Sequence, residues 1–387
     1  MNENKAIRVI LRVLSYVLVA VITACATMYL YGSSSVSSKL SEMYALIQRY
    51  YIGEVTGQQL EDGAAAGMVY ATGDQWSYYI PASEYDAHMA QVQNEYVGIG
   101  VTINSNMTDT GFEIIGVDEN GGAYEAGVQV GDVICQVAGQ EVVTAGSDIT
   151  KELIRGDAGT KVEIAVLRNG EKLFFEVTRK RIRVIVAKGE MLPGNIGLVT
   201  IENFDERCAD ETLAQVKALT EQGARALIFD VRFNPGGYKK ELVEILDYLL
   251  PEGPIFRSVS YTGEESVSES DAQCLDIPMA VLVNAESYSA AEFFAAALSE
   301  YDKAVVVGEA TTGKSYYQNT FRLSDGSAVG LSIGKYCTPN GVSLADVGGL
   351  KPDVEVLLDE ETLTKLYAGT LSHEEDLQLQ AAIQALQ

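Results

Sequence analysis

Residues 226–237 read Ala-Leu-Ile-Phe-Asp-Val-Arg-Phe-Asn-Pro-Gly-Gly, an apolar run that ends in a turn with two glycines. An uninterrupted apolar run of this length is typical of a strand that is buried on both faces of a parallel sheet. Similar runs occur at 196–201, 279–283 and 304–308. Helical patterns separate them at 209–221, 242–250 and 289–301. Strands that alternate with helices predict an α/β domain with a mostly parallel sheet.

Three of the loops that follow these strands carry residues suited to chemistry. They lead to the glycine pair Gly236 and Gly237, to Ser289, and to Lys314. Because the carboxyl ends of parallel strands gather at one edge of a sheet, where ligands bind, we expect the three loops to meet.

Ser289 stands at a strand-to-helix turn, where backbone N–H groups and the helix dipole favour a negative charge such as an oxyanion. A serine hydroxyl also needs a base, and the two histidines of the chain, His88 and His373, lie outside these loops. A lysine in a partly dry pocket releases its proton more readily than one in water, so Lys314 is the candidate base.

Each of these features also has a purely structural interpretation. A serine that opens a helix is commonly an N-cap, paired glycines commonly form a plain turn, and a lone lysine commonly lies on the surface. Their convergence at one sheet edge is what favours the catalytic interpretation.

The segment from 95 to 183 has a different pattern, with alternating residues typical of short strands and one amphipathic helix at 147–154. Its residues 123–134, Ala-Tyr-Glu-Ala-Gly-Val-Gln-Val-Gly-Asp-Val-Ile, resemble the "aglkxGDvI" stretch of PDZ domains. Gly98, Ile99, Gly100 and Val101 stand where that family binds the C-terminal carboxylate of a peptide. Glycines let successive N–H groups converge on an anion, and the next strand edge can pair with an extended peptide.

The α/β segment resembles the C-terminal processing peptidases, also called tail-specific proteases. Their motif D-L-R-x-N-P-G-G is matched by residues 230–237, and S-A-S-A-S-E by residues 287–292. V-G-x-x-T-x-G-K-x-x-x-Q is matched by 307–318, and G-x-x-P-D-v-e-v by 349–356. Lys314 follows Ser289 by 25 residues, as in the family.

This resemblance implies a crotonase-like protease domain in which Ser289 is the nucleophile, Lys314 the general base and Gln318 the residue that orients Lys314. The backbone amides of Ala290 and of Gly236 or Gly237 would form the oxyanion hole. The chain departs from the family pattern at Tyr288, Ala291, Glu300, Thr312 and Ser315. Tyr288 could crowd the substrate cleft, which bears on specificity more than on activity.

The composition is that of an acidic globular protein. The 387 residues, 47% hydrophobic and 21% charged, suit two or three domains. The 28 basic and 54 acidic residues give a net charge of −26, which argues against nucleic acid as a partner. The five cysteines are scattered, whereas zinc sites and dense disulfide frameworks have closely and regularly spaced cysteines. We therefore predict no metal and no cofactor.

Near the N-terminus, residues 13–31 contain no charged residue and follow Lys5, Arg8 and Arg12. This pattern predicts a single transmembrane signal anchor, with residues 1–12 in the cytoplasm and the rest outside the cell membrane. Two alternatives are a cleaved signal peptide, disfavoured because apolar residues continue past any cleavage site, and lipidation of Cys25.

The predicted organisation is therefore a cytoplasmic N-terminus, the anchor, and four further segments. These are a linker and helical region (32–94), a PDZ domain (95–183), a Ser/Lys protease domain (184–360) and an acidic helical tail (361–387) that could serve assembly into a homo-oligomer.

The expected partners are proteins with exposed C-terminal tails, cut near those tails. The alternatives are a non-catalytic PDZ scaffold on an inactive protease domain and a signal-peptide-degrading Ser/Lys protease. The PDZ would recognise the substrate tail, or hold the protease closed until a tail binds.

Overall fold

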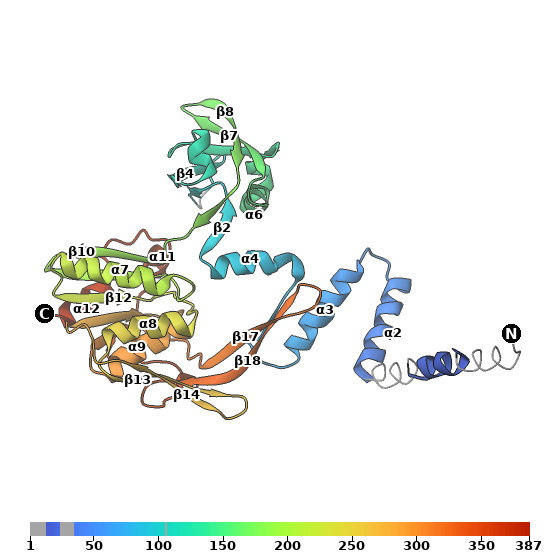
Figure 1. Cartoon of the computed structure of the whole chain (residues 1–387). Coiled ribbons are helices and arrows are strands. Elements are labelled where there is room, and N and C mark those ends of the chain that lie inside the picture. Colours follow the sequence, from blue (N-terminus) through green and yellow to red (C-terminus); the bar gives the residue numbers. More distant parts are fainter. Residues whose placement is uncertain (1–12, 24–34, 105–106) are drawn as a thin grey trace, which may run out of the picture. The chain divides into compact units, whose positions relative to one another are not determined.

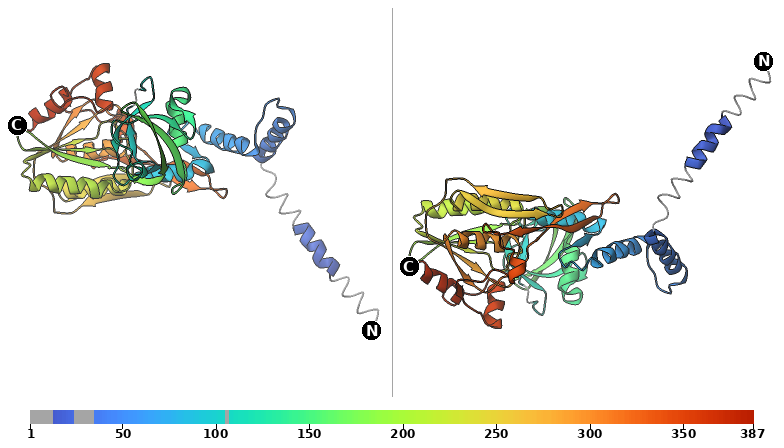
Figure 2. Two further views of the ribbon diagram at one scale, coloured as in Figure 1. Left: turned by 90° about the horizontal axis from the view of Figure 1, so that it is seen from above. Right: turned by 90° about the horizontal axis from the view of Figure 1, so that it is seen from below.

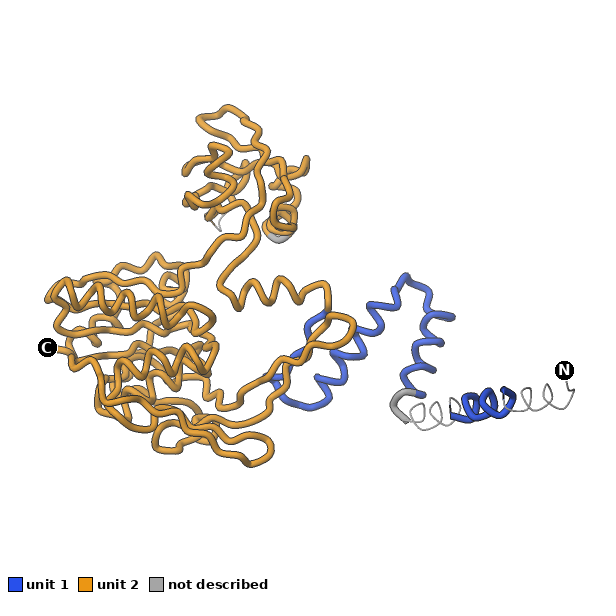
Figure 3. The backbone as a smooth tube through the Cα atoms, viewed as in Figure 1, with its two compact units in different colours: residues 1–81 blue, residues 82–387 orange. Residues whose placement is uncertain are grey.

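The computed structural model describes residues 13–23, 35–104 and 107–387 (Figure 1). The chain divides into two compact units, residues 1–81 and 82–387, which are coloured separately in Figure 3. The anchor predicted over residues 13–31 lies partly outside the described residues, and so do residues 1–12 and Cys25; residues 13–23 are helical. Among the described residues, no helix has both the length and the apolar composition that crossing a bilayer requires.

Besides the helical residues 13–23, the described residues of the first unit form two further helices and a short strand. They are α2 (Ser35–Tyr50), α3 (Gly57–Tyr70) and β1 (Tyr78–Ile80). Thr56 begins α3 with a capping box, because its hydroxyl accepts from the Gln59 N–H at 3.2 Å while the Gln59 side chain accepts from the Thr56 N–H at 2.9 Å. The Tyr79 hydroxyl donates to Asp62 at 2.7 Å and so ties β1 to α3.

The second unit begins with α4 (Ala82–Val92) and then enters a β-rich module. Its sheet has the strand order β3-β4-β5-β7-β8, and β6 pairs with β5. The strands are β3 (Val101–Ile103), β4 (Phe112–Val117), β5 (Val133–Val137), β6 (Gln140–Glu141), β7 (Lys161–Arg168) and β8 (Glu171–Thr178). The helices are α5 (Gly122–Ala126) and α6 (Val142–Ile154). Inward-facing residues such as Ile114, Ile134 and Ile164 are fully buried and form the core of the module.

A buried ion pair lies beside this core. Asp132, with a side chain 1% exposed, receives two hydrogen bonds from Arg168, at 2.7 and 2.8 Å. Burial favours the neutral acid, but the bonds from Arg168 and from the Gln129 N–H outweigh it and lower the pKa of Asp132. The pair fixes the turn that precedes β5.

The module joins the rest of the unit through two antiparallel strands, β2 (Glu95–Gly98) and β9 (Lys180–Arg183). Arg207 lies at their base and donates to the carbonyl oxygens of Asn94 at 2.9 Å and Val184 at 3.0 Å. The side chains of Asn94 and Asn203 hydrogen-bond to each other at 2.7 Å. Both connections of the module are therefore fixed to the loop 203–207.

The α/β domain is built on a sheet with the order β10-β11-β12-β15-β16-β19. The strands are β10 (Ala187–Leu192), β11 (Ile196–Ile201), β12 (Ala226–Asp230), β15 (Met279–Val283), β16 (Ala304–Gly308) and β19 (Val354–Glu355). β10 is antiparallel to β11, and every other neighbouring pair is parallel. The mostly parallel sheet predicted from the apolar runs is thus confirmed.

Helices cover both faces of this sheet, as the two views of Figure 2 show. One face packs against α7 (Cys208–Glu221), α8 (Lys239–Leu249) and α9 (Ala290–Glu300). The other face packs against Leu379 and Ala382 of α12 (Leu377–Ala385). The C-terminal residues are helical, as predicted, but α12 shares a hydrophobic core with the α/β domain, so it is part of that domain and not a separate tail.

A buried ionic contact strengthens this attachment. Arg232, in the loop after β12, donates to Asp376 at 2.8 Å and to Asp230 at 2.6 Å, and its side chain is 4% exposed. Gln378 also accepts from Arg232, at 3.0 Å. The start of α12 and the loop after β12 are therefore held together although they lie far apart in the sequence.

A second, antiparallel sheet extends from the domain. It includes β13 (Gly253–Ser260), β14 (Glu265–Ser270), β17 (Tyr316–Arg322) and β18 (Ala328–Cys337). The remaining helices are α10 (Leu344–Val347) and α11 (Glu360–Tyr367). β17 and β18 form a hairpin, and Gln318 lies on β17, which starts two residues after Lys314.

Candidate active site

Ser289 occupies a strained turn between β15 and α9. Its backbone has φ 58° and ψ −124°, a conformation that costs a residue with a Cβ energy and that recurs where a nucleophile is presented at the end of a strand. It directly precedes α9 and is 7% exposed. The turn therefore places the hydroxyl at the N-terminus of an 11-residue helix.

Glu292 holds this turn against the loop that carries Lys314. One of its carboxylate oxygens, Oε2, accepts from the backbone N–H groups of Ser289 and Lys314, both at 2.8 Å. The other, Oε1, accepts from the Thr311 hydroxyl at 2.5 Å and the Gly313 N–H at 2.6 Å. Burial raises the pKa of Glu292, and its four hydrogen bonds oppose that rise. A fully buried carboxylate thus joins two of the predicted loops.

The side chain of Lys314 reaches the ring of Tyr288. Its Nζ lies 5.8 Å from the ring centroid, within the range of a cation–π contact. Gln318, on β17, donates from its amide to the Ser332 hydroxyl at 2.9 Å and to the Tyr316 carbonyl at 3.1 Å. These bonds fix the Gln318 amide on the hairpin.

Asn234 connects the loop after β12 with the Ser289 turn. The carbonyl of this buried residue accepts from the Tyr288 N–H at 3.1 Å, and its side chain donates to the Ile201 carbonyl at 2.7 Å. Ser287 donates to the Val231 carbonyl at 2.8 Å. The loops after β12, β15 and β16 therefore meet at one edge, as the sequence predicts.

Gly236 is packed directly against the serine turn. A Cβ at this position would lie 2.8 Å from the Ala290 nitrogen and 2.8 Å from Ser289 Cβ, and its φ is +88°. Both constraints require glycine. The N–H of Gly236 donates to the Asn234 side chain at 2.8 Å.

Gly237 packs instead against the loop 203–207. A Cβ there would lie 2.2 Å from the carbonyl carbon of Phe204. Asp205, the next residue of that loop, has its pKa raised to about 7 by burial, with the carboxylates of Glu206 and Glu241 adding to the effect. The Cβ position of Gly236 thus faces Ser289 and Ala290, whereas that of Gly237 faces Phe204 and Asp205.

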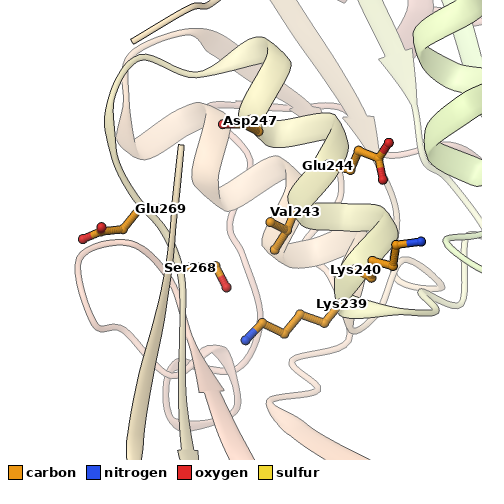
Figure 4. Close-up of a pocket in the computed structure, with 7 residues that line it drawn as sticks. All are labelled: Lys239, Lys240, Val243, Glu244, Asp247, Ser268 and Glu269. Carbon is orange, nitrogen blue, oxygen red and sulfur yellow. The ribbon is translucent and has the colours of Figure 1, made fainter. Parts of the chain in front are cut away.

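A cleft of about 640 Å³ opens beside this region, between α8 and β14 (Figure 4). Its lining residues are Lys239, Lys240, Val243, Glu244, Asp247, Ser268 and Glu269. Burial lowers the pKa of Lys239, whose Nζ lies 5.4 Å from the Phe256 ring centroid. Because Lys239 follows Gly237 by two residues, it is a second lysine near the glycine turn.

In the β-rich module, the residues predicted to bind a carboxylate form a bend between β2 and β3. The carbonyls of Ile99 and Gly100 accept from the N–H groups of Ala123 and Asp118, at 2.8 and 2.9 Å. Gly100 has φ +79°, and a Cβ there would lie 2.7 Å from Gly121 Cα. The following strand, β3, is an edge strand among the described strands, since β4 is its neighbour in the sheet order.

Comparison with known proteins identifies the family. The model of peptidase family S41 matches residues 195–356, and the PDZ domain model matches residues 96–178. A carboxyl-terminal-processing protease of Synechocystis sp. (strain ATCC 27184 / PCC 6803 / Kazusa) is 30% identical over 349 residues, which cover 88% of this chain and 80% of that protein. The chain belongs to peptidase family S41.

Other relatives agree with this assignment. The carboxy-terminal processing protease CtpA of Bacillus subtilis (strain 168) is 29% identical to this S41 peptidase over 356 residues, covering 88% of this chain and 76% of the relative. A crystal structure of a putative S41 protease from Bacteroides fragilis NCTC 9343 shares the fold, with a TM-score of 0.54 and 17% identity, over 87% of this chain and 92% of the other. The resemblance to C-terminal processing peptidases is confirmed, and the chain is a serine-type peptidase with a PDZ domain.

Two sets of contacts in the S41 site are not predicted from the sequence. Glu292 stands three residues after Ser289, the spacing of a capping box, so a local pattern indicated its bond to the Ser289 N–H. Its bonds to Gly313 and Lys314 are non-local and have no such pattern. The contact of Tyr288 with Lys314 likewise depends on the meeting of two loops.

Proposed function

We propose that this S41 peptidase is an endopeptidase that cuts proteins near their C-termini with a Ser289/Lys314 dyad. The observation that carries the proposal is the shared hydrogen-bond acceptor: Ser289 and Lys314 donate their backbone N–H groups to the same oxygen of Glu292. This buried carboxylate holds the backbones of the two residues close together, which supports a dyad.

In the proposed reaction, Ser289 Oγ attacks the carbonyl carbon of the scissile peptide bond while Lys314 Nζ accepts the hydroxyl proton. The resulting ammonium then donates that proton to the leaving amine, and an acyl-enzyme remains on Ser289. Water then attacks the acyl carbon while Lys314 Nζ accepts its proton; the ester bond to Ser289 breaks, the ammonium returns the proton to Ser289 Oγ, and the carboxylate product leaves. Gln318 would orient Lys314 when substrate is bound.

The negative oxygen of the tetrahedral intermediate needs N–H donors at the start of α9. We assign one to Ala290, which follows the nucleophile. The Gly236 N–H is already used by Asn234, so we assign the second to Gly237 and give Gly236 the role of allowing close approach.

We further propose that the PDZ domain binds the C-terminal tail of the substrate. The bend at residues 98–101 would receive the carboxylate on its backbone N–H groups, and the edge of β3 would pair with the extended tail.

The uncharged run at 13–31 supports a single membrane anchor with the protease domain on the extracytoplasmic side. Membrane and protein substrates are thus the proposed partners.

The rate at which the enzyme cleaves an unfolded test protein, measured for the wild type and for variants, tests the dyad. Ser289→Ala and Lys314→Ala should each abolish cleavage while the thermal unfolding temperature stays near the wild-type value. Lys239→Ala is the matched control, because burial favours a neutral amine at Lys239 and makes it the rival base. Cleavage that survives in Lys314→Ala and disappears in Lys239→Ala would transfer the role of base to Lys239. Equal turnover in wild type and Ser289→Ala would exclude the mechanism.

A further inference from the structure

Tyr288 lies where the family motif has a small residue, directly before the nucleophile. Its backbone N–H donates to the Asn234 carbonyl at 3.1 Å, while the Lys314 N–H donates to Glu292 at 2.8 Å. Both backbones are therefore fixed, and the side chains meet with Lys314 Nζ at 5.8 Å from the Tyr288 ring centroid.

The face of an aromatic ring attracts an ammonium and has no comparable attraction for a neutral amine. A general base must be neutral when it accepts the proton of the nucleophile. We propose that Tyr288 is a positioning residue that holds the Lys314 ammonium over its ring and thereby sets the pH above which Lys314 can act as the base. This inference rests on the proposed dyad.

Charged and titratable groups also lie on α9, on the loop before it and on the two strands that follow Lys314 in the sequence. α9 contributes the Glu292 carboxylate, and the loop before α9 contributes Glu286, whose charge acts on Tyr288. β17 contributes the neutral amide of Gln318. On β18, Lys335 lies over the Tyr316 ring at 5.4 Å and 3.9 Å from Asp346. In this proposal the carboxylates of Glu292 and Glu286 favour the Lys314 ammonium, as the ring does, so removal of the ring weakens this preference without reversing it.

Tyr288 itself stays neutral through the pH range of an assay. Burial raises the pKa of its phenol above the ordinary value of 10.0, and the Glu286 charge adds to the rise. The ring is thus a constant attractor, and the proposed contact acts on the protonation of Lys314 alone. When the ammonium releases its proton to solvent, the attraction ends and the amine becomes free to accept the Ser289 proton.

The pH dependence of kcat/KM tests this role. Tyr288→Leu keeps an apolar side chain but removes the ring, and it should move the acid limb of the profile about half a pH unit lower. Tyr288→Phe keeps the ring and should keep the acid limb of the wild type. Tyr261→Leu removes a tyrosine that is 81% exposed and serves as the matched control. An unshifted limb in Tyr288→Leu, or an equal shift in Tyr288→Phe, would overturn the inference.

A second measurement does not depend on turnover. In a Ser289→Ala background, the rate at which acetic anhydride acetylates Lys314 is followed against pH by mass spectrometry, with and without Tyr288→Leu. With Tyr288→Leu, the pH at which the acetylation rate is half-maximal (the half-point) should fall by the same amount as the acid limb of kcat/KM. If Lys314→Ala is inactive and the half-point does not move, the role of Tyr288 is refuted while the proposed dyad stands. If Lys314→Ala remains active, the proposed dyad fails, and a moved half-point would still support the contact.

Discussion

Ser289 and Lys314 donate their backbone N–H groups to a single oxygen atom, Oε2 of Glu292, at 2.8 Å each. The two residues stand on different loops, after β15 and after β16. Their placement therefore depends on a third residue that touches no substrate in the proposed reaction.

Glu292→Gln should lower kcat at least about 100-fold, because a small displacement of reacting groups costs this much. A glutamine offers one acceptor oxygen, and its NH₂ would face N–H groups that now donate to a carboxylate. Glu221→Gln, which changes an exposed glutamate at the end of α7, is the control and should retain activity. Steady-state kinetics on a peptide substrate measures both, and an active Glu292→Gln would show that the shared acceptor is dispensable.

Gly236→Ala should reduce kcat/KM at least about tenfold, since the new methyl would lie 2.8 Å from the Ala290 nitrogen and displace the serine turn. Gly263→Ala is the matched control. Gly263 has nearly the same φ, +83°, but nothing lies within 4 Å of its Cβ position. Both variants share the backbone strain, so a difference in kcat/KM isolates the contact with α9. Equal kinetics in the two variants would contradict the close packing of Gly236.

Asp205→Asn should stabilise the protein more at pH 8 than at pH 4. The folded state holds the Asp205 proton up to about pH 7, whereas the unfolded chain releases it near 3.8. Because the folded state binds more protons in this window, stability falls as pH rises through it and is constant above it. The gain at pH 8 should be at least about 1.4 kcal/mol, the equivalent of one pKa unit. Urea unfolding at both pH values checks this, and an equal effect at the two would refute the shift.

The contact between Arg232 and Asp376 should stabilise the attachment of α12. Asp376→Asn keeps an oxygen for the N–H groups of Gln378 and Leu379 at the start of α12, but it removes the charge that faces Arg232. We expect a loss of about 3 kcal/mol, because a partner of a buried charge is removed.

A variant of an exposed pair calibrates that loss. Glu361→Gln, which breaks the contact with Lys365 at 2.8 Å, should cost less than about 0.5 kcal/mol. Calorimetry measures both variants. Losses of the same size would mean that the Arg232 cluster adds no more stability than a surface pair.

The sequence predicts the parts of this fold that depend on local patterns. The strands at 226–230, 279–283 and 304–308 are visible as uninterrupted apolar runs, and their parallel pairing brings the three loops together. The packing of α12 has no comparable local pattern. Two buried polar residues at its start, Asp376 and Gln378, accept hydrogen bonds from Arg232, which lies 144 and 146 residues earlier in the chain.

The residues of the site likewise include some that local sequence patterns predict and some that they do not. Ser289 and Lys314 are recognisable from motif spacing, and the need for glycine at 236 is explained only by its approach to Ala290. Glu292 is visible as a helix cap, but its bonds to Gly313 and Lys314 join loops that are distant in sequence. The exchange of a small residue for tyrosine at 288 suggests a crowded cleft from sequence, while the structure places its ring against Lys314.

The most direct test of the dyad is the rate at which a serine-directed fluorophosphonate modifies Ser289, followed by intact-protein mass spectrometry. This reaction requires an activated hydroxyl but neither substrate binding by the PDZ domain nor product release. The dyad predicts that Lys314→Met slows modification at least about 100-fold while Lys239→Met leaves the rate within about twofold of wild type. Modification of Ser289 in Lys314→Met at the wild-type rate would contradict the account.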